Sequence, residues 1–353
     1  MTGYKGGQTW RPDGFRLYTC KHIQCFRRRW AVPNLLVFAA VLPYTLWRLR
    51  RIIESNNIDI VHVDGVTNFV PALAAWLTCR PIVWLYNDYL PRPLRPVLMP
   101  LMTRLSSTVL VQGESLKELY TAGNPRLRDK TAVLYSGVDT RKFMPDERGP
   151  ELRRKIRQEL GIPADCTLVG TIRNVNRFKG LTYFIEAAGR IKSRVPSAKF
   201  VIVGRKLDTD PGYWDHLQEL TERLGLKQDV IFTGFREDVP AILAALDVFV
   251  LASIEESCPV ALLEAMAMQV PVVATDVGAV AEMVLHGRTG FVVPPGDPDA
   301  ITEAVMTCLH MPGERVRQMV EAARQTVEAE FAIDIIARQQ ERLYESIIAT
   351  RGK

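Results

Sequence analysis

The stretch Glu256-Ser-Cys-Pro-Val-Ala-Leu-Leu-Glu264-Ala-Met-Ala-Met-Gln269 places one carboxylate inside an otherwise apolar segment. From Val260 to Met268 every other residue is apolar, so a helix here has no polar face that carries Glu264 into water. A helix that is apolar all round is normally buried, and an unpaired carboxylate is strongly disfavoured there. We therefore predict that Glu264 binds hydroxyl groups of a ligand. The alternative is a buried glutamate that is hydrogen-bonded to the backbone of another segment.

The same stretch leads into a short β-branched run, and this alternation of helix and strand recurs on both sides of it, as is typical of parallel βαβ units. The strand candidates of the second half are Thr167–Ile172, Lys199–Val203, Val230–Thr233, Val248–Leu251, Pro271–Ala274 and Phe291–Val293. Those of the first half are Ile58–Val63, Pro81–Tyr86, Thr108–Gln112 and Thr131–Tyr135. The predicted fold class is α/β, with two Rossmann-like parallel-sheet domains facing a cleft and ligands at the carboxyl ends of the strands.

The domain junction is predicted near residues 145–163, where a turn-rich stretch gives way to a charged helix, Glu151–Leu160, and then to Gly161-Ile-Pro163. We expect an N-terminal domain over residues 1–150 and a second domain over residues 151–330. A C-terminal helix within residues 331–353 is expected to pack back toward the first domain.

Composition indicates a globular protein large enough for two domains, because the 353 residues are 47% hydrophobic and 24% charged. The net charge of +6 suits phosphate-bearing ligands or an anionic membrane surface. No nucleic-acid-binding motif is found, so we expect no nucleic acid partner. The six cysteines form no Cys-x-x-Cys pair and show no zinc-like spacing to histidine, which favours reduced thiols of a cytoplasmic protein and predicts no metal site. We find no signal peptide at the N-terminus.

A basic loop, Arg173-Asn-Val-Asn-Arg177-Phe-Lys179-Gly180, follows the first strand of the second domain and precedes its first helix. A loop at the carboxyl end of a strand, beside a helix N-terminus, is a natural anion site. Arginine offers a planar fork and lysine a compact point charge, a combination suited to a diphosphate. The alternative is an ordinary solvated basic loop.

A second element consists of Glu256 and Glu264 on either side of a helix N-terminus whose N–H groups lack partners within the helix. A ligand with phosphates and vicinal hydroxyls would satisfy both features, since phosphate accepts from N–H groups and carboxylates accept from hydroxyls. Glu256 could equally be a plain surface residue, and its neighbour Glu255 weakens any claim made from Glu256 alone.

Several further motifs occur in order along the chain. They are Ser136-Gly-Val-Asp139, Val201-Ile-Val-Gly204, Phe232-Thr-Gly-Phe235, Glu282 with Gly287, and Gly290-Phe-Val-Val-Pro294. Together with Glu256-x-x-Pro259-x-x-x-x-Glu264, they closely resemble the retaining glycosyltransferases of family 4 (glycosyl transferases group 1), which have the GT-B fold. The resemblance covers about residues 55–350, and it depends on the order of the motifs rather than on any single one.

The resemblance implies roles for residues of the second domain. Glu264 would accept hydrogen bonds from the ribose of a nucleotide, and Glu256 would bind hydroxyls of the donor sugar. The backbone at Val260 and Ala261 would meet the phosphate and the sugar. Lys179, with either Arg173 or Arg177, would neutralise the departing diphosphate, and we favour Arg173.

On the acceptor side, Asp59-Ile-Val-His62-Val-Asp64 resembles the family's Asp-(Ile/Val)-Val-His-x-His, which implies that His62 faces the reacting sugar across the cleft. Asp64 stands where the pattern has its second histidine. The alternative for His62 is a histidine satisfied within the core.

The N-terminus departs from the family, because Gly3-Tyr-Lys-Gly-Gly7 lies too early to follow a strand. We expect that the first domain is truncated and lacks its first strand and glycine-rich loop. The alternative to an enzyme is therefore a non-catalytic nucleotide-sugar-binding subunit or a fragment that lacks part of the acceptor domain.

The activity implied is metal-independent, retaining transfer of a hexose from a nucleotide-diphosphate sugar to a hydroxyl group. No cofactor is expected, and the donor substrate would be a UDP- or GDP-sugar. By analogy with relatives, the acceptor would be lipid-linked or a polysaccharide or glycoconjugate precursor.

Two basic and apolar stretches suit an anionic membrane surface. One is Arg27–Trp30 followed by Arg48–Arg51, and the other is Pro91–Met102. We thus expect a cytoplasmic protein that is peripheral on the inner face of the membrane. The alternative is a core-facing helix with a solvated basic end. The apolar run Ala31–Trp47 is too short and too interrupted by proline to predict a membrane span.

Overall fold

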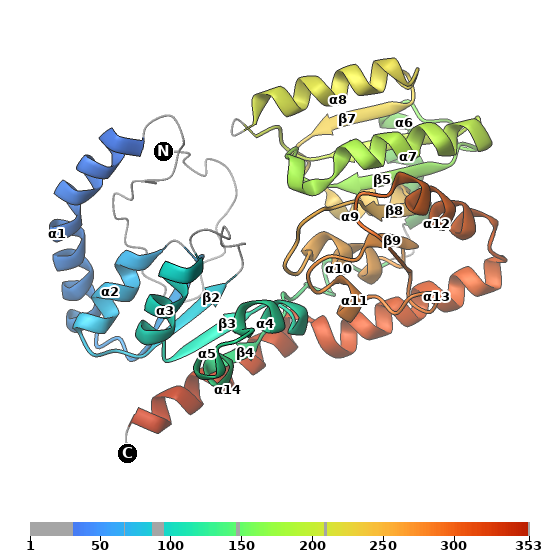
Figure 1. The fold of residues 1–353 in the computed structure, drawn as a ribbon. Helices are drawn as coiled ribbons and strands as arrows, with labels where there is room; N and C mark the ends of the chain where they lie inside the picture. Colours follow the sequence, from blue (N-terminus) through green and yellow to red (C-terminus); the bar gives the residue numbers. More distant parts are fainter. Residues whose placement is uncertain (1–30, 67, 87–94, 146–148, 208–209, 352–353) are drawn as a thin grey trace.

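The computed structural model describes residues 31–66, 68–86, 95–145, 149–207 and 210–351 (Figure 1). The expectations about the first strand, the glycine-rich loop at Gly3–Gly7 and the basic stretch Arg27–Trp30 fall outside these residues. So do residues 91–94 of the second basic and apolar stretch.

The first domain is a sheet of four parallel strands in the order β1-β2-β3-β4. The strands are β1 (Val61–Asp64), β2 (Ile82–Tyr86), β3 (Thr108–Val111) and β4 (Thr131–Val133). The helices of this half are α1 (Ala31–Ser55), α2 (Phe69–Leu77), α3 (Arg95–Leu105), α4 (Glu114–Thr121) and α5 (Pro125–Lys130).

The two faces of this sheet are buried by different parts of the chain. Trp84 and Tyr86 of β2 pack with residues of α2, α3 and α4, whereas Val83 of the same strand points to the opposite face. This alternation is the period-two geometry of a strand, and both sets are apolar because both faces are covered.

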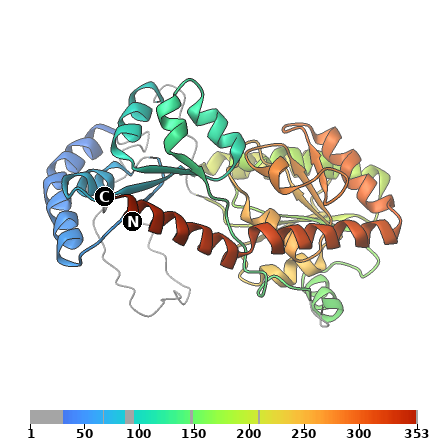
Figure 2. The ribbon, with the colours of Figure 1, turned by 90° about the horizontal axis from the view of Figure 1, so that it is seen from below.

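The opposite face is covered by α14 (Ile333–Arg351), which runs beneath the first sheet after the chain has completed the second domain (Figure 2). Ile336, Leu343 and Ile347 of α14 pack in one cluster with Val83 and Leu110. The exact domain limits at residues 150 and 330 stay predictions.

The second domain is a sheet of six parallel strands in the order β10-β9-β8-β5-β6-β7. The strands are β5 (Leu168–Ile172), β6 (Lys199–Val203), β7 (Val230–Gly234), β8 (Val248–Leu251), β9 (Val272–Thr275) and β10 (Phe291–Val293). The helices and helical turns are α6 (Gly149–Glu159), η2 (Arg177–Lys179), α7 (Leu181–Arg194), α8 (Pro211–Arg223), α9 (Val239–Ala245), α10 (Val260–Ala267), α11 (Val280–Met283), α12 (Pro298–His310), α13 (Gly313–Thr326) and η3 (Val327–Phe331).

Two separate apolar cores lie on the two faces of this sheet. One contains α10 and α11 with β8 and β9, and the other contains α7, α8 and α12. The predicted pair of parallel α/β domains is thus confirmed.

The strand order reverses between β5 and β8, because the chain first moves from β5 to β6 and β7 and then returns to the other side of β5. In open parallel sheets, ligands bind outside the carboxyl ends of the strands at such a reversal. The loops that follow β5 and β8 are therefore where a ligand site is expected.

No helix within the described part of the chain is long and apolar enough to cross a membrane.

Candidate active site

The basic loop after β5 lies directly against the loop after β8. The backbone N–H of Ile254 donates to the carbonyl oxygen of Phe178 at 2.8 Å. Gly180 ends the basic loop with φ +63°, and a Cβ placed there would lie 1.8 Å from the carbonyl oxygen of Ala252. The close approach of the two loops therefore depends on the missing side chain at Gly180.

Three side chains converge on one oxygen of Glu256. Lys179 Nζ lies 2.7 Å from Glu256 Oε1, Arg173 Nη1 lies 3.3 Å from it, and Ser253 Oγ donates to it at 2.9 Å. Burial acts to raise the pKa of Glu256, but the charges of Arg173 and Lys179 and the hydrogen bonds outweigh it, so the pKa lies below its ordinary value. Glu256 is consequently a buried, ionised carboxylate at the reversal point of the sheet.

Arg173 has N–H groups that find no acceptor among the residues that the structure describes. Its side chain is only 9% exposed, yet its Nε and Nη2 atoms are buried without such a partner. Asn176 Oδ1, in the same loop, is also buried without a donor. Buried polar groups normally have partners, so these atoms indicate that a ligand supplies acceptors and a donor here.

Glu264 lies on α10, which begins at Val260 with Pro259 as a cap that offers no side-chain hydrogen bond. Burial raises the pKa of Glu264 to about 7, against the opposing charges of Lys142 and Arg173. Within the described residues we find no hydrogen bond or ion pair for the Glu264 carboxylate. Val260 is exposed and Ala261 is half-buried, so the start of α10 is open to a ligand.

The structure separates the two candidate arginines. Arg177 is ion-paired with Asp210 at 2.6 Å and lies over the ring of Tyr213, with 63% of its side chain exposed. Arg173 is the arginine that contacts Glu256.

His62 lies on β1, and its Nδ1 atom is 2.5 Å from the hydroxyl oxygen of Tyr344 on α14. Burial lowers the pKa of His62, and the charge of Asp64 partly opposes this. Among the described residues no contact joins His62 to the cluster around Glu256. Its predicted role toward the sugar stays a prediction.

The sequence contains two Asp-x-Asp triplets, at 208–210 and 297–299. Their described aspartates have structural partners. Asp297 caps α12 by accepting from the backbone N–H groups of Asp299 and Ala300. Asp299 pairs with Arg190 at 2.7 Å, and Asp210 pairs with Arg177. Within the described chain no group of three or more acidic, histidine or cysteine side chains is arranged to hold a metal ion.

The structure shows roles for three residues around this site that the sequence did not predict. Ser253 donates to Glu256, and the charge of Lys142 acts on Glu264. Neither could be predicted, because serine and lysine are common residues and no motif marks these two. Glu282 of α11 was noted only as a motif position, but it reaches the first domain and accepts from the Tyr135 hydroxyl at 2.6 Å.

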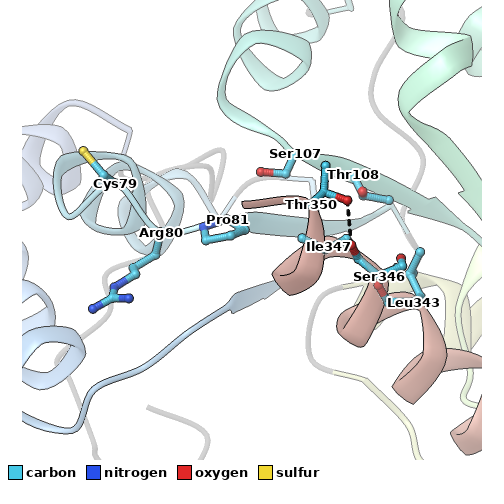
Figure 3. Close-up of a pocket in the computed structure, with 9 residues that line it drawn as sticks. All are labelled: Cys79, Arg80, Pro81, Ser107, Thr108, Leu343, Ser346, Ile347 and Thr350. Carbon is cyan, nitrogen blue, oxygen red and sulfur yellow. Dashed lines mark hydrogen bonds between the residues drawn. The ribbon is translucent and has the colours of Figure 1, made fainter. Parts of the chain in front are cut away.

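A cavity of about 560 Å³ lies elsewhere, at the amino ends of β2 and β3 beside α14 (Figure 3). Its lining residues are Cys79, Arg80, Pro81, Ser107, Thr108, Leu343, Ser346, Ile347 and Thr350. Figure 3 shows the Arg80 side chain directed away from the α14 residues. The cavity is at the edge of the sheet opposite to the one where ligands are expected, so it is not part of the candidate site.

Comparison with known proteins identifies the family of the chain. Residues 164–311 match the family model for glycosyl transferases group 1, and residues 13–142 match that for glycosyltransferase family 4. EpsD of Bacillus subtilis is 31% identical over 292 residues, which are 79% of this chain and 74% of EpsD. An uncharacterized glycosyltransferase of Methanocaldococcus jannaschii is 27% identical over 336 residues, 91% of this chain and 84% of that protein.

Solved structures give the same result for the fold. HepE of Anabaena, in complex with UDP and glucose, superimposes with a TM-score of 0.77 at 25% identity, over 84% of this chain and 81% of HepE. A glycosyltransferase from Rickettsia africae superimposes with a TM-score of 0.78 at 24% identity, over 87% and 82% of the two chains. The chain thus belongs to the family 4 (group 1) glycosyltransferases with the GT-B fold. The predicted family and the predicted enzyme class are confirmed.

Proposed function

We propose that this glycosyltransferase transfers a hexose from a nucleotide-diphosphate sugar to a hydroxyl acceptor, with retention of anomeric configuration and without a metal ion. One observation supports this above all. Lys179 and Arg173 meet Glu256 at the reversal point of the sheet, close to the half-buried Glu264 that has no described partner. HepE, whose structures contain UDP and UDP-glucose, supports a nucleotide-sugar donor.

The chemistry follows from where charge develops. As the bond between the anomeric carbon and the diphosphate breaks, negative charge grows on the departing oxygen, and preorganised donors stabilise it. Lys179, the unused N–H groups of Arg173 and the start of α10 at Val260 and Ala261 supply such donors. They can neutralise the diphosphate without a metal ion, which is why we propose metal independence.

The remaining contacts orient the donor. Glu264 accepts from the vicinal ribose hydroxyls, and Glu256 accepts from a sugar hydroxyl while it stays paired with Lys179. The acceptor hydroxyl attacks the anomeric carbon, and its proton passes to the departing phosphate oxygen. His62 contributes from the acceptor side, and Arg177 plays a secondary part at the edge of the diphosphate.

We also propose that the protein acts in the cytoplasm, on a lipid-linked or polysaccharide-precursor acceptor at the inner face of the membrane. A groove of about 440 Å³ between α1, α2 and α3 supports this proposal. It is lined by Phe38, Leu42, Phe69, Val70, Leu73, Trp76, Leu101, Arg104 and Leu105. Trp47 on α1 and Trp76 on α2 are exposed, and Arg51 lies over the Trp47 ring. Basic and aromatic residues together suit an anionic bilayer.

Donor binding is the first test. Isothermal titration with UDP and GDP should detect binding of at least one nucleotide to the wild-type chain, and Glu264→Gln should weaken that binding at least tenfold. Glu219→Gln, an exposed carboxylate on α8, should bind as the wild type does. Equal affinity of wild type and Glu264→Gln would remove Glu264 from the nucleotide site. Binding without release of nucleotide from UDP-glucose or GDP-glucose, with any acceptor offered, would favour a non-catalytic sugar-nucleotide-binding subunit.

The membrane proposal is tested separately. Flotation with vesicles that contain anionic phospholipid should carry the wild-type chain, whereas a double variant, Trp47→Ser with Trp76→Ser, should remain unbound. Vesicles of zwitterionic lipid alone should bind neither chain. Absence of wild-type binding to anionic vesicles would contradict the proposal.

A further inference from the structure

Helix α4 of the first domain lacks a cap from its own sequence. Its N-cap residue is Gly113, which offers no side-chain hydrogen bond. The missing acceptors come from the second domain, since Glu282 Oε2 accepts from the backbone N–H of Glu114 at 2.8 Å and Oε1 accepts from that of Ser115 at 2.9 Å. A carboxylate at this end of a helix is favoured both by the free N–H groups and by the helix dipole.

Gly113 is required by the same contact. A Cβ at this position would lie 2.8 Å from Ala279 Cβ and 3.2 Å from Glu282 Oε1. A serine, threonine or aspartate cap would therefore push the two domains apart. The domain contact takes the place of the usual cap, and α4 depends on the second domain for its first turn.

Glu282 is held firmly as a charged group. Partial burial acts to raise its pKa, but the hydrogen bond from Tyr135 and the two amides of α4 outweigh it, so the pKa lies below its ordinary value. Tyr135 follows β4 at the point where the chain leaves the first sheet. Glu282 thus binds both the first domain and the start of the connection between the domains.

This contact surface is continuous with the loop that carries Glu256. Ser115 Oγ donates to the carbonyl oxygen of Gly278 at 2.6 Å. Gly278 lies so close to the Glu256 backbone that a Cβ on it would be 2.2 Å from the Glu256 carbonyl oxygen. The Ser257 hydroxyl donates in turn to Gln112 Oε1 of the first domain at 3.0 Å.

We propose that Glu282 is a positioning residue for glycosyl transfer. By capping α4 across the domain boundary it fixes the orientation of the first domain against the loop of Glu256, and so the placement of the acceptor relative to the donor sugar. It touches neither substrate. The inference depends on the proposed transfer reaction at Glu256, but the contact itself can be measured without activity.

Each domain has its own core, so loss of this contact should loosen their relative orientation rather than unfold either one. In Glu282→Ala we expect faster hydrogen exchange at the amides of Glu114 and Ser115 and a broader range of shapes in small-angle scattering. The affinity for UDP or GDP, whichever binds the wild type, should change less than twofold. Turnover of UDP-glucose or GDP-glucose should fall at least tenfold in kcat with little change in the donor KM.

Two further variants separate positioning from folding. Ser115→Ala removes the hydroxyl contacts with Gly278 and Glu282 but keeps both backbone amides that Glu282 caps. It should therefore change hydrogen exchange and kcat in the same direction as Glu282→Ala, but by less. Glu282→Gln keeps one carbonyl acceptor for α4 and should restore part of the lost kcat. The control Glu222→Ala, an exposed carboxylate paired with Lys227 on the same domain, should match the wild type.

Wild-type kcat in Glu282→Ala, or a lower kcat with unchanged exchange at α4, would overturn the proposal. So would a loss of nucleotide affinity as large as the loss of kcat, because the donor site itself would then be damaged. A wild-type chain that neither binds nor turns over a nucleotide sugar would instead contradict the proposed function, whatever the exchange at α4.

Discussion

Lys179 Nζ lies 2.7 Å from Glu256 Oε1, and this ion pair joins the loop after β5 to the loop after β8. The two strands are far apart in sequence but adjacent in the sheet, at the point where the strand order reverses. The pair keeps a cation and an anion together where a diphosphate and a sugar hydroxyl are proposed to bind. A diphosphate would therefore meet a lysine already oriented by Glu256, with Arg173 beside it.

Lys179→Met should weaken binding of UDP or GDP about tenfold or more, because a charge-assisted contact to phosphate contributes roughly 1.5–3 kcal/mol. Isothermal titration measures the effect. Lys227→Met, a lysine of the same domain that is 72% exposed, is the matched control and should bind nucleotide normally. Equal affinity of the Lys179 variant and the wild type would exclude Lys179 from the diphosphate site.

Glu264 should make the stability of the protein depend on pH. Burial raises the pKa of Glu264 from its ordinary value of 4.5 to about 7. Between these two pH values, Glu264 is protonated in the folded chain but already ionised in the unfolded chain. The free energy of unfolding therefore falls as pH rises through this window. Glu264→Gln removes this dependence, so its advantage over the wild type should grow with pH to at most about 3 kcal/mol and then level off.

Urea unfolding of the wild type and of Glu264→Gln, from about pH 5 to about pH 8, measures this difference. Glu219→Gln should follow the wild-type curve at every pH. A constant difference between wild type and Glu264→Gln over this range would show that Glu264 is already ionised below the window.

Gly180→Ala should disturb the site more than an ordinary glycine substitution. The new Cβ would lie 1.8 Å from the Ala252 carbonyl oxygen, so the basic loop must move away from the loop of Glu256. Gly225→Ala is the matched control, because Gly225 has a similar φ of +69° but no atom within 4 Å of the new Cβ. Its cost should be the backbone strain alone, roughly 1–2 kcal/mol.

Comparing the two glycine variants isolates the collision from the strain. We expect Gly180→Ala to lose more unfolding free energy than Gly225→Ala and to lose nucleotide affinity, which Gly225→Ala should keep. Similar behaviour of both variants in urea unfolding and isothermal titration would show that the close approach of the two loops is not required.

Ile336→Ala should test the packing of α14 against the first sheet. Ile336 is buried in the cluster with Val83 and Leu110, so its truncation should lower the unfolding free energy by about 2–4 kcal/mol. Ile348→Ala, on the same helix but 41% exposed, should change it by less than about 0.5 kcal/mol. Urea unfolding of the two variants provides the measurement, and equal effects would mean that α14 is not anchored through this face.

The local elements could be predicted closely from the sequence. The strands Lys199–Val203, Val248–Leu251 and Phe291–Val293 agree residue for residue with β6, β8 and β10. Prediction was less accurate at Ile58–Val63, where the strand begins only at Val61. Apolar runs bounded by turns are reliable because the strands of a covered parallel sheet are buried on both faces. The ends of a strand depend on its pairing with a neighbouring strand, and the residues of the strand itself do not show where that pairing stops.

The residues of the candidate site could be predicted only in part from the sequence. The sequence identified the basic loop, Glu256 and Glu264, because their charges are conspicuous next to apolar segments. The spacing of residues in the basic loop does not distinguish Arg173 from Arg177, since both lie in this one short segment. Their separate partners, Glu256 and Asp210, come from distant segments.

By itself, the sequence determined the alternation of strands and helices and the presence of an isolated carboxylate on an apolar helix, because both follow from side-chain periodicity along one segment. Only the tertiary structure decided which segments meet. The pairing of β5 with β8, the contact of His62 with Tyr344 and the capping of α4 by Glu282 each join residues far apart in the chain. Such contacts are fixed by how whole elements pack, and no local pattern encodes them.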